Sequence, residues 1–246
     1  MSTYNREIKR NKKRKFVGLF IVALLSIATL LWLADKPIKT LLTTAKATPV
    51  TQVSTSNVSI NDSPLNHDLI LVNRSNPVPK DYKVDLVELS NGQSVDRQIY
   101  PALQEMFDAA RAQGVYPVVV SGYRTAEKQQ LLMDEKISAY VAEGLSSDKA
   151  VAKAKEWVAI PGTSEHQLGL AVDINADGVN SSGDEVYQWL DQNAHTFGFI
   201  CRYPAGKADI TGISYEPWHY RYVGIDDATK IYQQGLCLEE YLGALN

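Results

Sequence analysis

Cysteine is scarce in this chain, since only Cys201 and Cys237 occur among its 246 residues. The two form no CxxC pair, which excludes a cysteine-rich zinc module. In an oxidising compartment they can form one disulfide. Pairing depends on the distance between their Cα atoms, so a disulfide and two buried free thiols are both compatible with the sequence.

Basic residues do not outnumber acidic ones in most of the chain. Residues 1–15 hold seven of the 25 Lys and Arg residues and one of the 28 Asp and Glu residues. The rest of the chain therefore has 18 basic and 27 acidic residues, a formal charge of −9. Binding to phosphates requires clustered Lys and Arg, so this balance argues against nucleic acid as the main partner.

Charged residues are also absent from the eighteen-residue apolar run Phe16–Leu33. As a helix this run would be about 27 Å long, close to the thickness of a hydrocarbon core. The basic residues precede it. The positive-inside rule therefore predicts a cytoplasmic tail (1–15), a single-pass anchor in the cell membrane (16–34) and an extracytoplasmic remainder.

A cleaved signal peptide is the alternative to an anchor. The small-x-small motif Ala45-Lys46-Ala47 would be its cleavage site, but it lies about a dozen residues beyond the apolar run. No cysteine directly follows the run, so lipoprotein anchoring is not indicated.

Residues 35–68 are rich in Thr, Ser and Asn, which predicts a flexible stalk before a folded domain over 69–246. In that domain helical and strand patterns mix without a regular βαβ repeat. We therefore expect the α+β class, with a small, mainly antiparallel sheet and flanking helices. Helices are predicted over 98–113, 125–143, 147–158 and 184–197, and strands over 69–72, 115–121, 170–175, 199–203 and 218–223. The apolar stripe of the second helix is expected to be Leu131, Leu132, Ile137 and Tyr140.

Two histidines and two carboxylates lie in two short motifs. His166 and Asp173 belong to SEHQLGLAVDI, whereas Glu216 and His219 belong to EPWHYRY. Two imidazoles and one carboxylate form a common catalytic zinc shell, and a further glutamate can act as a general base. Taken singly, each residue has an ordinary interpretation, such as a hydrogen-bonded loop histidine or an aspartate that caps a turn.

The spacing of Glu216 and His219 needs a further explanation. Residues three apart in a regular strand face opposite sides of the sheet. Pro217 lies between them and disturbs strand pairing, so a local kink is expected there.

A third motif, SGYRT, places Arg124 between a predicted strand and a predicted helix. Gly122 precedes it by two residues and lets the backbone turn sharply. A guanidinium at this point can hold a carboxylate or stabilise an oxyanion. The ordinary alternative is a salt bridge on the surface.

With SGYRT, SEHQLGLAVDI and EPWHYRY together, residues 75–235 resemble the VanY-type zinc D-alanyl-D-alanine carboxypeptidases. This group includes D,D- and L,D-carboxypeptidases and dipeptidases that act on bacterial cell-wall peptides. The resemblance implies one zinc ion held by His166, Asp173 and His219, with Glu216 as the base and Arg124 stabilising the oxyanion. It also implies substrate contacts by Gln129, Ser164 and Tyr203. Trp218 either forms a wall of the pocket or packs in the core.

The expected function is therefore removal of a C-terminal D-alanine from peptidoglycan stem peptides by a monomeric zinc enzyme. A D,D-dipeptidase, a wall endopeptidase, a non-catalytic wall-binding module and a membrane-bound scaffold are the alternatives. A non-catalytic module would be expected to lack Glu216 or a metal ligand.

The other notable polar residues are interpreted as structural, not as part of an active site. His195 lies in a predicted amphipathic helix and is expected to pack there, and the acidic loop beginning at Asp177 is interpreted as a solvated turn. Tyr220 and Tyr222 alternate with Arg221 and Val223, which is typical of a half-buried strand.

Overall fold

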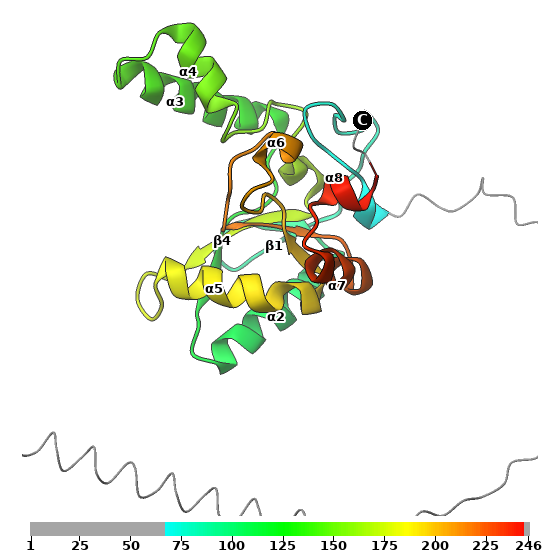
Figure 1. Cartoon of the computed structure of the whole chain (residues 1–246). Helices are drawn as coiled ribbons and strands as arrows, with labels where there is room; N and C mark the ends of the chain where they lie inside the picture. Colours follow the sequence, from blue (N-terminus) through cyan, green and yellow to red (C-terminus); the bar gives the residue numbers. More distant parts are fainter. Residues whose placement is uncertain (1–66, 244–246) are drawn as a thin grey trace, which may run out of the picture. The chain divides into compact units, whose positions relative to one another are not determined.

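A four-stranded antiparallel sheet forms the centre of the fold (Figure 1). Its strands, in spatial order, are β3 (Pro117–Ser121), β4 (Ala171–Ala176), β6 (His219–Tyr222) and β5 (Phe199–Cys201). A separate antiparallel hairpin joins β1 (Leu86–Glu88) to β2 (Ser94–Asp96). The predicted α+β class with small antiparallel sheets is confirmed.

The computed structural model describes residues 67–243. The predicted tail and apolar anchor, and nearly all of the stalk, lie outside the described residues. Within 67–243, no helix combines the length and apolar character that crossing a membrane would require.

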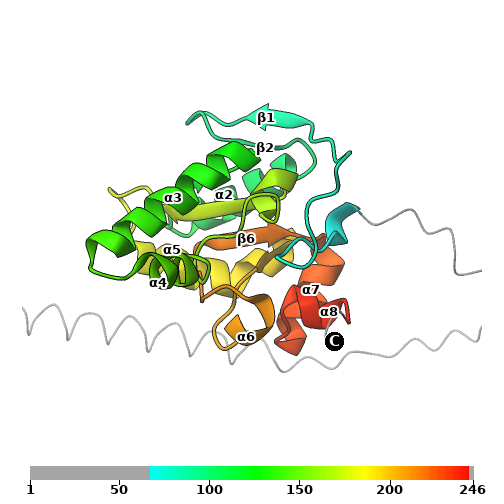
Figure 2. The same ribbon diagram turned by 90° about the horizontal axis from the view of Figure 1, so that it is seen from above.

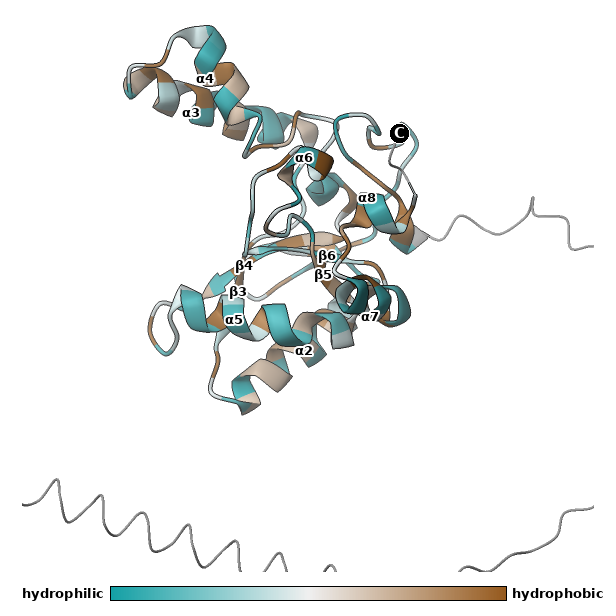
Figure 3. Ribbon diagram, in the orientation of Figure 1, coloured by the Kyte–Doolittle hydropathy of each residue, from teal (hydrophilic) through white to brown (hydrophobic). Residues whose placement is uncertain are grey.

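One face of the sheet carries the hydrophobic core. The helices α2 (Tyr100–Ala112) and α5 (Gly183–Asn193) cover this face, and α7 (Ile225–Gln234) lies beside them (Figure 1). Side chains of a strand alternate between its two faces. Val172 and Ile174 are therefore buried in the core on either side of Asp173, which faces the other way. Figure 3 shows hydrophilic and hydrophobic residues alternating along α5, and mostly hydrophilic residues in α7.

The helices α3 (Ala126–Ala142) and α4 (Ser147–Ala154) form a hairpin that projects from the body of the domain (Figures 1 and 2). Thr125 caps α3 as expected, since its Oγ1 accepts a hydrogen bond from the Lys128 N–H at 3.2 Å. The predicted buried stripe is wrong in part, because Leu131 is 56 % exposed. The fully buried residues of α3 are Gln129 and Met133, because this helix packs on α4 and beside a cleft rather than on the core.

Short helical segments complete the domain. They are η1 (His67–Leu69), η2 (Glu165–Leu168), η3 (Ala194–Phe197), α6 (Ala208–Thr211) and α8 (Leu238–Tyr241). The helix predicted over 184–197 is divided into α5 and η3, and it ends at Gly198 with a left-handed φ of 86°, as its sequence indicates.

The strand predicted over residues 69–72 is wrong. Leu69 ends η1, and the following residues pair with no strand among the described residues. The carbonyls of Asp68 and Ile70 instead accept hydrogen bonds from the Arg221 guanidinium. The hairpin β1–β2 was not predicted, because strands of three residues are too short to produce a clear periodicity.

Cys201 and Cys237 are both free thiols. Of the two possibilities left by the sequence, the structure therefore has the unpaired cysteines. The Cys201 thiol lies 3.7 Å from the carbonyl oxygen of Glu216 and donates to it.

Candidate active site

The pairing of β4 with β6 brings Asp173 and His219 together as direct cross-strand partners. Nδ1 of His219 lies 3.2 Å from Oδ1 of Asp173, and Nε2 of His166 lies 3.4 Å from the same oxygen. The three potential ligand atoms lie within 4.8 Å of one another. Sequence spacing and strand register together therefore produce a cluster of two imidazoles and one carboxylate.

His166 is held in one orientation by the backbone of a neighbouring segment. It lies in η2, which ends at Gly169 with a left-handed φ of 72°. Its Nδ1 is 2.7 Å from the carbonyl oxygen of Gly122. Because a carbonyl can only accept, Nδ1 carries the proton and Nε2 presents its lone pair to the cluster.

Gly122 is required for close packing rather than for a special backbone angle. An added Cβ at this position would lie 2.1 Å from the carbonyl oxygen of Ser94 in β2. That carbonyl accepts a hydrogen bond from the Tyr123 N–H. The sequence-based explanation, a sharp turn at Gly122, is therefore replaced by close approach of two backbones.

The expected kink at Pro217 is present. The His219 N–H donates to the Glu216 carbonyl at 3.3 Å, so residues 216–219 form a turn directly before β6. The turn directs the Glu216 carboxylate to the same side as His219, with Oε2 3.6 Å from Nδ1. Burial raises the pKa of Glu216 to about 7, a value suited to accepting and releasing a proton near neutral pH.

Arg124 lies beside the carboxylate of Asp173. Its Nη2 is 3.8 Å from Oδ2 of Asp173, and its side chain is only 18 % exposed. The Arg124 N–H donates to the His166 carbonyl, which ties the two segments together. Among the described residues its Nε is buried without a hydrogen-bond partner, and the side chain lines the cleft described below.

The local charges favour a bound cation. Burial lowers the pKa of His166 to about 4, so this imidazole is neutral. Burial also opposes the charge on His219, but the nearby carboxylates of Asp173 and Glu165 outweigh it and raise the pKa to about 9. Three carboxylates, those of Asp173, Glu216 and Glu165, surround the two rings. Arg202 and Arg221 pair with Glu165, so Asp173 and Glu216 are the carboxylates that would face a bound cation.

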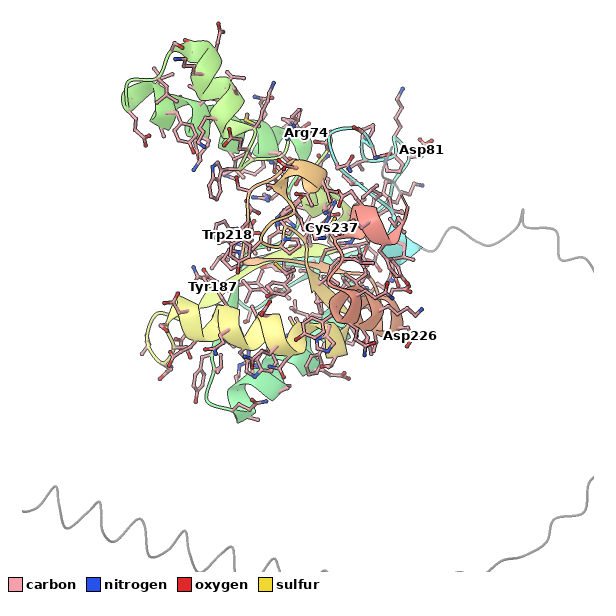
Figure 4. All side chains as sticks on the ribbon, in the orientation of Figure 1. Arg74, Asp81, Tyr187, Trp218, Asp226 and Cys237 are labelled. Atoms are coloured by element: carbon pink, nitrogen blue, oxygen red, sulfur yellow. The ribbon has the colours of Figure 1, made fainter. Side chains whose placement is uncertain are left out.

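A cleft of about 620 Å³ opens from the cluster towards the α3–α4 hairpin. The remaining predicted contact residues all line it: Gln129, Ser164, Tyr203 and Trp218. The Tyr203 ring lies 4.8 Å from the His219 ring, and Figure 4 places Trp218 at the edge of the body below the hairpin.

Gln129 is 1 % exposed, and its amide nitrogen donates to the Ala159 carbonyl at 2.8 Å. Its amide oxygen has no partner within residues 67–243, although a buried acceptor is normally satisfied. Ser164 is similarly buried, at 2 % exposure, directly before η2. The cleft therefore has buried polar groups for a peptide on one wall and aromatic rings on another.

The two groups interpreted as structural lie outside this cluster. His195 stacks on Tyr232 with 3.8 Å between ring centroids. Oδ1 of Asp177 accepts hydrogen bonds from the N–H groups of Val179, Asn180 and Ser181, which makes the acidic loop a self-contained turn.

Sequence reasoning missed three buried charges next to the cluster, those of Glu165, Arg202 and Arg221. All three are 0 % exposed. In a half-buried strand Arg221 would face solvent, but here it faces Glu165. The available signal was its position two residues after His219, because residues i and i+2 of a strand share a face.

Comparison with known proteins identifies relatives of this fold and cluster. The family described as "VanY: D-alanyl-D-alanine carboxypeptidase" matches residues 92–225, which is more than half of the chain. A D-alanyl-D-alanine carboxypeptidase of Enterococcus faecalis (strain ATCC 700802 / V583) is 68 % identical over 174 residues, covering 71 % of this chain and 65 % of the relative. A putative carboxypeptidase, YodJ of Bacillus subtilis (strain 168), is 39 % identical and is covered to 66 %. The chain thus spans slightly less than two thirds of these two relatives.

Solved structures show the same similarity. A vancomycin resistance D,D-pentapeptidase VanY variant from a VanB-type resistance cassette, in complex with Zn(II), is 67 % identical. The match has a TM-score of 0.71 and covers 72 % of this chain and 99 % of that one. The LD-carboxypeptidase LdcB is 38 % identical with a TM-score of 0.59, over 74 % of this chain and 88 % of the other.

Proposed function

The chain belongs to the VanY D-alanyl-D-alanine carboxypeptidase family, and on that basis we propose that it is a zinc-dependent carboxypeptidase. Its substrates would be peptidoglycan stem peptides, from which it would remove the C-terminal D-alanine. The observation that carries the proposal is the convergence of His166, Asp173 and His219 with Glu216 at the base of one cleft.

The cluster fits a zinc ion. Within the described part of the chain, Nε2 of His166 and Oδ1 of Asp173 are buried without any hydrogen-bond partner. Buried polar atoms are rarely left unsatisfied unless a ligand completes them. The donor set of two nitrogens and one oxygen is also one that catalytic zinc sites use. Zinc held there supplies a Lewis acid that polarises a carbonyl and makes water more acidic.

Glu216 would act as the general base. The residue is 7 % exposed, and its carboxylate lies at the cleft beside His219. From that position it would take a proton from the attacking water on a carboxylate oxygen. The same oxygen would then release the proton to the leaving amine nitrogen of D-alanine, so that the group returns to its starting state.

Arg124 would stabilise the negative charge that develops on the scissile carbonyl oxygen, since its guanidinium lines the cleft beside Asp173. The buried amide oxygen of Gln129 and the Ser164 hydroxyl would contact the peptide, and Tyr203 and Trp218 would enclose its terminal residue. All of these side chains come from one chain, so we propose that the enzyme works as a monomer.

The bond cleaved is proposed to be D-Ala-D-Ala. The solved relatives with higher identity are D,D-peptidases, whereas LdcB is less similar. A cleft of about 620 Å³ lies in the usual range of ligand sites, about 300–1,000 Å³. It has room for the stem beyond the terminal dipeptide, which favours a carboxypeptidase over a dipeptidase. The intact set of ligands and base speaks against a purely wall-binding module.

The test is a digest of purified pentapeptide and tetrapeptide stems by the full chain in detergent, with and without a chelator, read by mass. We expect loss of a single D-alanine, faster from the pentapeptide and abolished by the chelator. Preference for the tetrapeptide would identify an L,D-carboxypeptidase. Absence of cleavage by zinc-loaded protein would contradict a catalytic function.

We also propose that residues 16–34 anchor the protein in the cell membrane, with the catalytic domain outside. The uncharged run Phe16–Leu33 and the seven preceding basic residues support this placement. The full chain should remain in the pellet when membranes are washed with carbonate, and a variant lacking residues 1–35 should be released. A full chain recovered in the wash would contradict the anchor.

A further inference from the structure

Glu165 is a buried acid that the proposed reaction does not use. It directly precedes His166 in η2, lies beside the His219 ring and is 0 % exposed. Its Oε2 is 3.8 Å from Nε2 of His219. This nitrogen is on the far side of the ring from Nδ1, which faces Asp173.

Two arginines hold the other oxygen of this carboxylate. Oε1 of Glu165 accepts from Nε of Arg202 at 2.7 Å and from Nη1 of Arg221 at 2.9 Å. Arg202 also forms a bidentate pair with Glu239 of α8, at 2.9 and 2.6 Å. Arg221 is fixed in turn by the backbone carbonyls of Asp68 and Ile70. The orientation of Glu165 is thus determined by groups from both ends of the described chain.

The remaining atoms form an unsatisfied pair. Within residues 67–243, Oε2 of Glu165 and Nε2 of His219 are both buried and neither has a hydrogen-bond partner. One is an acceptor and the other is a donor when the ring proton is on Nε2. A small movement of the ring would close the gap and satisfy both atoms.

We propose that Glu165 is a positioning residue that holds the His219 ring through its Nε2–H, so that Nδ1 presents its lone pair to zinc. A hydrogen bond of this kind fixes both the tautomer and the orientation of a ligand histidine. His166 is fixed in the same way by the Gly122 carbonyl. The inference rests on zinc binding in the proposed function but not on which peptide bond is cleaved.

The distances explain why a carboxylate is needed here. With Oε1 occupied by two guanidinium groups, a glutamine would place its amide oxygen there and its NH₂ towards His219. A donor facing Nε2 requires Nε2 to accept, which moves the ring proton to Nδ1 and removes the lone pair that zinc needs.

The test is the zinc affinity of the full chain with Glu165→Gln, measured by competition with a chromophoric chelator. We expect the zinc affinity to be about 10–100-fold weaker, which is the usual loss when a residue that hydrogen-bonds to a metal ligand is removed. Glu239→Gln is the matched control, because it removes a buried charge from the same Arg202 without contacting His219. Its zinc affinity should be that of the unaltered chain.

Equal affinity in Glu165→Gln and the unaltered chain would overturn the inference, as would equal weakening in both variants. If the unaltered chain binds no zinc, the proposed function fails as well, so the two failures are distinguishable.

A second measurement needs no substitution. In the zinc-loaded, ¹⁵N-histidine-labelled chain, NMR should show His219 protonated at Nε2 with slow exchange of that proton. A His219 proton on Nδ1, or one that exchanges freely at Nε2, would also overturn the inference, even if Glu165→Gln does not fold.

Discussion

Replacing Glu216 by alanine is expected to lower turnover by about 1,000-fold while leaving one zinc ion bound per chain. General acid–base catalysis contributes roughly 10²- to 10⁴-fold to enzymatic rates. Glu216 is the buried carboxylate at the cleft that is not part of the His-Asp-His cluster. The turn before β6 depends on the Glu216 carbonyl rather than its side chain, so the position of His219 should be retained.

The measurement combines steady-state kinetics on the pentapeptide with zinc content by mass spectrometry. The loss should appear in kcat with little change in KM, because proton transfer occurs in the transition state. Glu105→Ala is the control, since Glu105 is exposed on α2, on the other face of the sheet. Near-normal turnover in Glu216→Ala would show that the base lies elsewhere, and loss of zinc would show that Glu216 acts as a ligand.

Replacing His166 by alanine is expected to remove both the metal and the activity. Only two of the three ligand side chains would remain, and zinc sites of this kind use all three. The loss of zinc affinity should exceed the roughly 10–100-fold loss that follows removal of a residue that only hydrogen-bonds to a metal ligand. The Gly122 carbonyl would also lose its donor, which costs about 1–3 kcal/mol of folding stability when the group is buried.

Zinc content after gel filtration, together with thermal unfolding, would check this prediction. His195→Ala is the matched control, because His195 stacks on Tyr232 outside the cluster. That variant should retain one zinc ion and normal turnover. A His166→Ala protein that still binds one zinc ion tightly would exclude His166 from the metal site.

Much of the candidate site could be predicted from local sequence. His166 and Asp173 are separated by six residues, among them Gly169, and Glu216 and His219 lie either side of Pro217. Each short spacing leaves a pattern in the sequence, whereas the pairing of β4 with β6 brings the two motifs together. The cap at Thr125 and the helix end at Gly198 are likewise local.

Other features depended on partners that are distant along the chain. The sequence predicts a buried Leu131, but α3 projects from the body of the domain (Figure 1), and helical periodicity does not reveal what a helix packs against. Residues 69–72 are apolar enough for a strand, yet nearby carbonyls pair with a guanidinium from β6.

The sequence by itself indicated the chemical class of the site, because its three motifs together resemble those of a zinc carboxypeptidase family. Only the tertiary structure decided that Glu165, Arg202 and Arg221 form a buried charge network behind His219. Glu165 is 37 residues from Arg202 and 56 from Arg221. An unpaired buried charge is strongly destabilising, and the pairing exists only once η2, β6 and the residue after β5 have come together.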